Sequence, residues 1–156
     1  MQRACLGILR FCLAAWLGIA VFFVMLVVDL RQSNLFAEAT KFDHPKVLFP
    51  LYYRFELTLL GAALVCAFVG LWSGTLGRPR KFAIMQLVFV AMALALWDYA
   101  MIYRELLDLM NGPPPLPPAF HTLHRLSRGF NEVIVGATAI AALLALIPER
   151  SAQMQR

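Results

Sequence analysis

The chain has 156 residues, of which 61% are hydrophobic and 15% charged, and its formal net charge is +5. Soluble domains contain about 45–50% apolar and about 25% charged residues, so this composition indicates a membrane protein without room for a separate soluble catalytic module. The positive charges do not form a basic stripe interleaved with aromatic residues, which argues against a nucleic-acid partner and leaves the lipid bilayer.

Four apolar segments are long enough to form membrane-spanning helices, which need about 20 residues each. We expect an all-α, polytopic four-helix bundle in a single domain, residues 1–156, with helices at about residues 6–29, 50–73, 82–108 and 119–147. The first segment exceeds the about 7–15 apolar residues of a signal-peptide core, so we expect it to be retained. Pro50 suits the first turn of the second helix, and Pro148 is expected to end the fourth.

The loops between these segments predict the orientation in the membrane. The loop after the second helix is short and carries Arg78, Arg80 and Lys81 without an acid. Such a basic loop marks the cytoplasmic side, so we expect both termini to be cytoplasmic in a multi-pass protein, of the kind found in a bacterial inner membrane. A proline-rich linker, residues 112–118, separates the third and fourth helices, because consecutive prolines prevent a helix from continuing.

The acidic residues and histidines are distributed unevenly. All acidic residues except Glu149, and all three histidines, fall toward the predicted extracytoplasmic side. At about 100° per residue, His121 and Glu132 share one face of the fourth helix, and Asp98 aligns with Glu105 on the third. Charges within a bilayer usually turn inward and pair, so we expect Asp98 and Glu132 to lie deepest in a common cluster. The expected polar pocket or ion-pair cluster consists of Arg54, Glu56, Asp98, Glu105, Arg125, Arg128, Asn131 and Glu132.

His121 and His124 raise a second hypothesis, that of a bound haem or metal ion. At positions i and i+3 both imidazoles reach the same side of a helix, with a nearby carboxylate as a further ligand. Against it, the chain has no HExxH pattern, and Cys5, Cys12 and Cys66 lack metal-motif spacing and are expected to be packing residues. The tyrosines at positions 52, 53, 99 and 103 are candidates for an outer aromatic belt.

Three segments resemble the transmembrane protein 205-like family: WLGIAVFFV (16–24), LFPLYYRFE (48–56) and FHTLHRLSRGFNEV (120–133). The most specific part is the pattern F-x-x-L-H-x-x-S-x-x-x-N, formed by Phe120, Leu123, His124, Ser127 and Asn131. This resemblance implies a four-helix membrane domain whose biochemical role is poorly defined. SRGFNEV is also similar to a segment of membrane proteins of the CopD and HemJ type, which implies copper handling or haem-dependent oxidation as an alternative.

The sequence contains no phosphate loop, no nucleophile paired with a base and no nucleotide site, which favours a protein without enzymatic activity. We therefore expect a membrane protein whose extracytoplasmic polar pocket binds or moves a small solute or ion. Two alternatives stay open at this point. The first is a haem- or metal-binding membrane redox protein, and the second is a structural or accessory subunit in which the polar cluster only holds the helices together.

Overall fold

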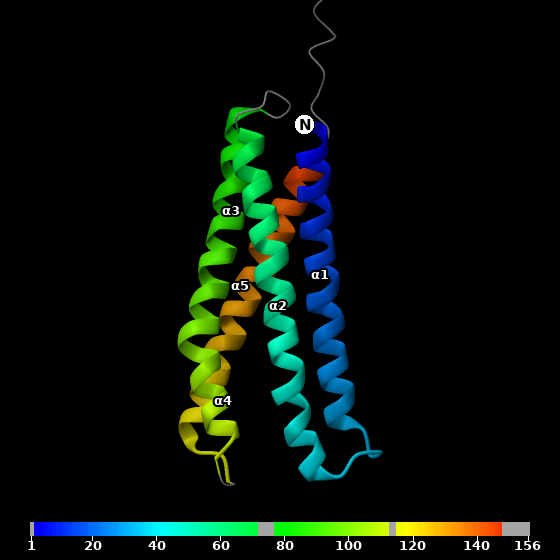
Figure 1. Ribbon diagram of the computed structural model, residues 1–156, viewed down its shortest axis with the longest axis vertical. Helices are drawn as coiled ribbons and strands as arrows, with labels where there is room; N and C mark the ends of the chain where they lie inside the picture. The colour runs from blue at the N-terminus through cyan, green and yellow to red at the C-terminus, as the bar shows by residue number, and fades with distance from the viewer. Residues whose placement is uncertain (1, 72–76, 113–114, 148–156) are drawn as a thin grey trace, which may run out of the picture.

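Four long helices run side by side along the longest axis of the molecule (Figure 1). The computed structural model describes residues 2–71, 77–112 and 115–147. These form α1 (Gln2–Gln32), α2 (Glu38–Leu71), α3 (Arg78–Trp97), the π-helix η1 (Asp98–Tyr103), α4 (Arg104–Met110) and α5 (Pro118–Leu146). The segments α3, η1 and α4 follow one another without a break and together make the third long helix. Within the described ranges every regular element is helical, which confirms the all-α prediction.

Each long helix is long and apolar enough to cross a membrane, as the sequence predicts. All begin earlier than expected, and the difference is largest for α2, which starts at Glu38 rather than near Pro50. The placement of Pro50 in a first helical turn is therefore wrong, because both Pro45 and Pro50 lie inside α2. Pro148, the end of the second predicted helix and part of the 112–118 linker lie outside the described residues.

The early start of α2 follows from its packing against α1. A proline inside a helix removes one backbone hydrogen bond, so the turns around it need other contacts. Phe23 of α1 supplies them, with its ring centroid 5.3 Å from that of Phe49 and 4.4 Å from that of Tyr52. Aromatic contacts on both sides of Pro50 therefore hold the helix together where the sequence alone suggests that it begins.

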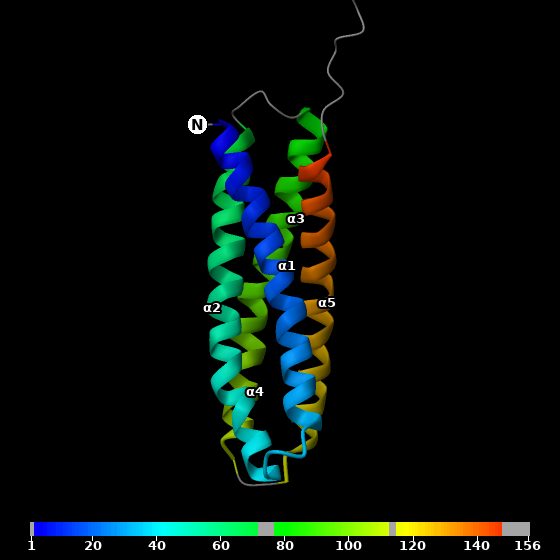
Figure 2. The ribbon, with the colours of Figure 1, turned by 90° about the vertical axis from the view of Figure 1, so that its right-hand side faces the viewer.

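The helices alternate in direction, so each end of the bundle has its own set of connections (Figures 1 and 2). The start of α1, the end of α2, the start of α3 and the end of α5 lie at one end. The α1–α2 and α4–α5 connections lie at the other. Around the bundle, α1 contacts α2 and α5, and α3 contacts the same two helices from the opposite side.

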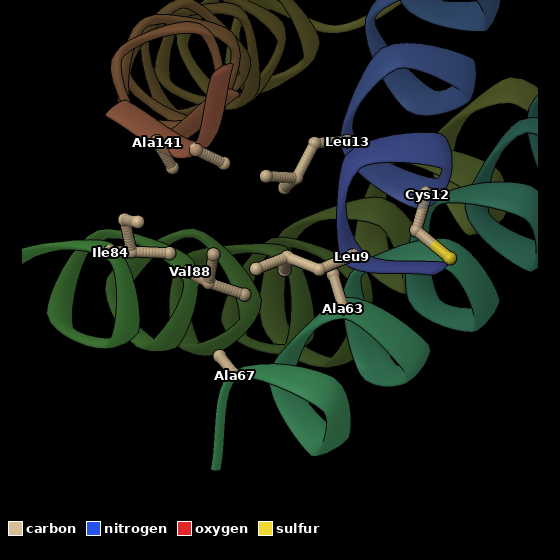
Figure 3. Close-up of a cluster of buried hydrophobic side chains, with 9 residues drawn as sticks. Leu9, Cys12, Leu13, Ala63, Ala67, Ile84, Val88 and Ala141 are labelled. Atoms are coloured by element: carbon tan, nitrogen blue, oxygen red, sulfur yellow. The ribbon is translucent and has the colours of Figure 1, made fainter. Parts of the chain in front are cut away.

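The buried core changes character along this axis. Nearer the termini it consists of small aliphatic side chains from all four long helices, and we call this part the aliphatic half (Figure 3). Its buried members are Leu9, Cys12, Leu13, Ala63, Ala67, Ile84, Val88, Ala141 and Ala145. Nearer the other end lies the aromatic half, with Trp16, Ala20, Tyr52, Tyr53, Leu60, Ala91, Ala95, Tyr103 and Ile134. The expectation that the cysteines are packing residues is confirmed for Cys12, which is free and buried in the aliphatic half.

Two arginines close the aliphatic half at the end of α5. Arg10 of α1 donates from Nε to the carbonyl oxygen of Ala145 over 2.8 Å. Arg80 of α3 donates to the carbonyl oxygens of Leu144 and Ile147. The last carbonyl groups of a helix have no partner within it, and in lipid each unpaired group is costly. The arginines therefore satisfy the end of α5 and tie it to its two neighbouring helices.

The helices are longer than the hydrocarbon layer of a bilayer is thick, and their charges are concentrated outside an uncharged stretch. The 34 residues of α2 span about 51 Å at about 1.5 Å each, against about 30 Å of hydrocarbon. Residues 57–71 of α2 and 133–147 of α5 contain no Asp, Glu, Lys or Arg. The remaining parts of both helices carry exposed charges.

Candidate functional site: a buried carboxyl cluster

Asp98, the first residue of η1, is the centre of a hydrogen-bond cluster inside the aromatic half. Its side chain is 0% exposed. Its Oδ2 accepts hydrogen bonds from the hydroxyl of Tyr53 at 2.7 Å, the hydroxyl of Ser127 at 3.0 Å and the amide of Asn131 at 3.4 Å. One carboxyl oxygen therefore collects donors from α2 and α5 and joins both helices to η1.

Asn131 extends this cluster toward α1. Its amide nitrogen also donates to the backbone oxygen of Ser127 at 3.1 Å, and its Oδ1 accepts from the hydroxyl of Tyr52 at 2.6 Å. The ring of Tyr52 in turn contacts that of Trp16, with centroids 5.2 Å apart. All four long helices thus contribute a side chain, so the cluster contributes to holding the bundle together at this level.

Glu56 is the unusual member of the site. It is 0% exposed, and neither of its carboxyl oxygens has a hydrogen-bond partner among the described residues. Oδ1 of Asp98 is buried and unpartnered in the same way, and the two carboxyl groups lie close enough to interact electrostatically. No Lys or Arg of the described chain is buried with them. Three carboxyl oxygens are therefore enclosed in apolar surroundings without a compensating donor or positive charge.

Further unsatisfied groups belong to the same half of the molecule. The indole nitrogen of Trp16 and the hydroxyl of Tyr103 are buried without a hydrogen-bond partner among the residues described. Buried polar groups of folded proteins are nearly always paired, and each exception requires an explanation. His44 Nδ1 and Thr138 Oγ1 are the other such atoms, so most of the unpartnered atoms among the described residues belong to the aromatic half and its two acids.

The π-helix η1 determines which side chains of the third long helix enter the site. A π-turn bonds residue i to residue i+5, so the residues after it are rotated relative to an α-helix. Ile102 and Tyr103 both become buried, whereas Glu105 is exposed. The expected alignment of Asp98 with Glu105 assumes an uninterrupted α-helix and is therefore wrong. Single π-turns are frequent at functional sites.

The expected ion-pair cluster divides into two groups. Glu56, Asp98 and Asn131 come together inside the bundle. The other five are exposed: Arg54, Glu105, Arg125, Arg128 and Glu132. The expectation that these charges turn inward and pair between helices is corrected, because their side chains are exposed on the surface of the described bundle. Arg128 pairs with Glu132 on its own helix at 3.2 Å, and both side chains are mostly exposed.

The histidines and tyrosines also differ from expectation. His121 and His124 are exposed, and the ring of His124 stacks on Phe120 with centroids 5.8 Å apart. In the part of the chain that the structure describes, no three His, Cys, Asp or Glu side chains are grouped closely enough to hold a metal ion. The tyrosines do not form an outer belt, since Tyr52 and Tyr53 are buried. The hydroxyls of Tyr52 and Tyr53 find polar partners inside the bundle, which hydrocarbon would not offer.

A pocket of about 270 Å³ lies beside the carboxyl cluster, between α2 and the η1–α4 segment. Its lining residues are Pro50, Tyr53, Arg54, Leu57, Tyr99, Tyr103 and Leu107. Tyr53 belongs to both places, because its ring lines the pocket while its hydroxyl donates to Asp98. A tyrosine pair at positions i and i+4, Tyr99 and Tyr103, is the signal in the sequence that points to this pocket.

In comparisons with protein-family models, curated proteins and solved structures, no match to the chain was found. The similarity to the transmembrane protein 205-like family therefore rests on the three sequence segments alone. The chemistry of the site has to be inferred from its own residues.

Proposed function

We propose that the protein binds a small monovalent cation at the carboxyl pair of Glu56 and Asp98. The supporting observation is the set of three buried carboxyl oxygens without a partner among the described residues. An isolated carboxylate in an apolar environment is strongly disfavoured, so a buried carboxyl group either takes up a proton or is accompanied by another positive charge. A bound cation supplies that charge, whereas an apolar ligand or an anion does not.

The donor atoms narrow the class of cation. Around Asp98 are the hydroxyl oxygens of Tyr53 and Ser127 and the amide nitrogen of Asn131, and no thiolate or imidazole is in hydrogen-bond contact with it among the described residues. Oxygen ligands favour hard cations, and the described residues hold no group of three His, Cys, Asp or Glu side chains that could cage a divalent metal ion. Protons, alkali cations and ammonium-type cations share the required chemistry.

The membrane orientation is part of the proposal. The basic loop residues Arg78, Arg80 and Lys81 belong to the end of the bundle that also holds the start of α1. If this end faces the cytoplasm, as short basic loops do, the carboxyl pair lies on the extracytoplasmic side of the aliphatic half. The affiliation with the transmembrane protein 205-like family belongs to the same proposal and is supported by the segments named above.

The experiment measures the unfolding temperature of the purified full-length chain in detergent. Sodium, potassium and bulky N-methylglucamine chlorides are compared at equal ionic strength and at several pH values. A ligand that binds only the folded state stabilises it by RT ln(1 + [L]/Kd), so we expect sodium or potassium to raise the unfolding temperature of the wild type. A stabilisation that depends on pH alone identifies the proton as the cation.

The matched variants decide whether the response belongs to the carboxyl pair. Glu56→Gln and Asp98→Asn are expected to abolish the response to the cation. Glu105→Gln removes an exposed carboxyl of the third long helix and is expected to leave the response unchanged. The proposal is refuted when Glu56→Gln responds to every condition as the wild type does.

The two alternatives make different predictions. A purely structural cluster requires Glu56 to contribute bonds between helices, yet both of its oxygens are unpartnered within the described chain. A haem protein shows a Soret absorption band that is lost on substitution of His121 or His124. No described contact of these exposed histidines favours that alternative over the carboxyl site.

A further inference from the structure

We infer that the pocket beside the carboxyl pair binds a small protonated primary amine with a compact apolar body. This inference rests on the proposed function, because it names the kind of cation that approaches the site from the α2–η1 side. It is carried by the size of the pocket, by its tyrosine walls and by one unpartnered hydroxyl group.

The size of the pocket points to an organic ligand. Its volume of about 270 Å³ is many times the about 30 Å³ that a water molecule occupies in the liquid. A bare alkali cation would leave most of this space without contacts. Small-molecule sites begin near 300 Å³, so the pocket suits a molecule of a single ring or a short branched chain.

The walls favour an apolar body that carries a positive charge. The three tyrosine rings contact one another, with centroid distances of 4.6 Å between Tyr53 and Tyr103 and 5.3 Å between Tyr53 and Tyr99. Tyr99 and Tyr103 are stacked at 5.8 Å. Aromatic π-systems attract cations, most strongly where water is excluded. Pro50, Leu57 and Leu107 add aliphatic surface for the rest of the ligand.

The polar groups of the pocket indicate the chemistry of the charged end of the ligand. Tyr103 lines the pocket and is 5% exposed, and its hydroxyl has no hydrogen-bond partner among the described residues. The oxygen of this hydroxyl accepts a hydrogen bond from an N–H group, which a primary ammonium has and a quaternary one lacks. Tyr53 lines the pocket and its hydroxyl donates to Asp98, so a wall of the pocket is joined directly to the carboxyl group of Asp98.

Arg54 sets the direction in which such a ligand lies. It lines the pocket but is exposed, so its guanidinium group belongs to the outer side. The ammonium group is repelled by Arg54 and attracted by the carboxyl pair, which orients the head inward and the apolar body outward. The opposite arrangement, an anion held by Arg54, is the competing outcome of the test.

The test is calorimetric titration of the full-length chain in detergent at neutral pH with three probes of similar shape: benzylamine, benzyl alcohol and benzoate. We expect benzylamine alone to bind measurably. Tyr103→Phe keeps the ring and removes the hydroxyl, and it is expected to weaken benzylamine binding by about tenfold, the usual effect of losing one hydrogen bond to a charged group. Phe89→Ala, on the exposed outer face of α3, is the control and is expected to bind as the wild type does.

The outcomes separate this inference from the proposed function. Preferred binding of benzoate, equal binding of benzyl alcohol, or unchanged affinity in both Tyr103→Phe and Tyr99→Ala would each overturn the amine pocket. If the amine pocket is overturned but sodium, potassium or pH still changes the unfolding temperature of the wild type and not of Glu56→Gln, the cation site stands without the amine pocket. If that difference between the wild type and Glu56→Gln is absent as well, the proposed function fails together with the inference.

Discussion

The two halves of the bundle solve the problem of packing in lipid differently. In the aliphatic half, aliphatic side chains such as Leu13, Val88 and Ala141 fill the space between the helices, and Arg10 and Arg80 bond carbonyl groups at the end of α5. In the aromatic half, large polar side chains meet at Asp98, and several buried polar atoms have no described partner. The contacts of the aliphatic half serve to stabilise the fold. The aromatic half instead buries polar atoms without a described partner, which lowers the free energy of unfolding.

This difference shows where function belongs in a small membrane protein. Helices in lipid gain nothing from hiding apolar surface, so close packing and interhelical hydrogen bonds must stabilise the bundle. The aliphatic half achieves this without any buried charge among its described residues. Because the aliphatic half stabilises the bundle, the aromatic half can contain unsatisfied polar groups, which natural proteins keep where activity requires them. The following variants test this division.

The largest loss of stability is expected from Leu13→Ala in the aliphatic half. Leu13 is fully buried, and truncating such a side chain leaves a cavity that costs about 2–5 kcal/mol. Denaturant unfolding in detergent measures this loss, with Leu143→Ala on the exposed surface as the control. The response to cations is expected to survive. Its disappearance would show that the two halves are not independent.

Asp98→Ala is expected to destabilise the protein by about 2–4 kcal/mol. The substitution leaves the hydroxyls of Tyr53 and Ser127 without their acceptor, and each stranded buried group costs about 1–3 kcal/mol. Asp98→Asn retains an acceptor oxygen and is expected to lose clearly less stability. The same unfolding assay compares the two, and an equal loss in both variants would contradict the role of Oδ2 as a shared acceptor.

Glu56→Leu is expected to stabilise the protein by about 1–3 kcal/mol while abolishing the cation response. A leucine of similar size removes two buried oxygens that have no described partner and restores an apolar contact surface. A loss of stability in Asp98→Ala together with a gain in Glu56→Leu would show that the two carboxyl groups of the aromatic half have different roles. A marked loss of stability in Glu56→Leu would instead identify Glu56 as a structural residue.

The sequence predicts the four long helices because a membrane imposes a minimum apolar length that is visible without any alignment. It does not predict which face of each helix turns inward. In water, apolar periodicity identifies the buried face, but in lipid both the core and the outer surface are apolar. Glu56, Asp98 and Asn131 could be predicted as site members since polar groups at this depth are rare, whereas Arg54 and Glu105 could not be told apart from them.

Two further features required the structure. The π-turn at Asp98–Tyr103 has no signature in the residues themselves, and it changes the alignment of everything that follows it on the third helix. The start of α2 is hidden because Pro45 and Pro50 resemble the boundary of a helix, although the helix continues through both and contacts with Phe23 support it on either side of Pro50. Both features depend on neighbouring helices and not on local preference.

The smallest effect is expected from Arg128→Ala, which breaks the ion pair with Glu132. The two side chains are 74% and 68% exposed, so water solvates them almost as well apart as together. Exposed pairs four residues apart on a helix contribute less than about 0.5 kcal/mol, and we expect neither stability nor cation binding to change measurably. Arg10→Ala is the matched variant at the other end, because it loses a hydrogen bond to the Ala145 carbonyl that lipid cannot replace. Equal effects of the two substitutions would show that the charged surface of the aromatic half also contributes to the fold.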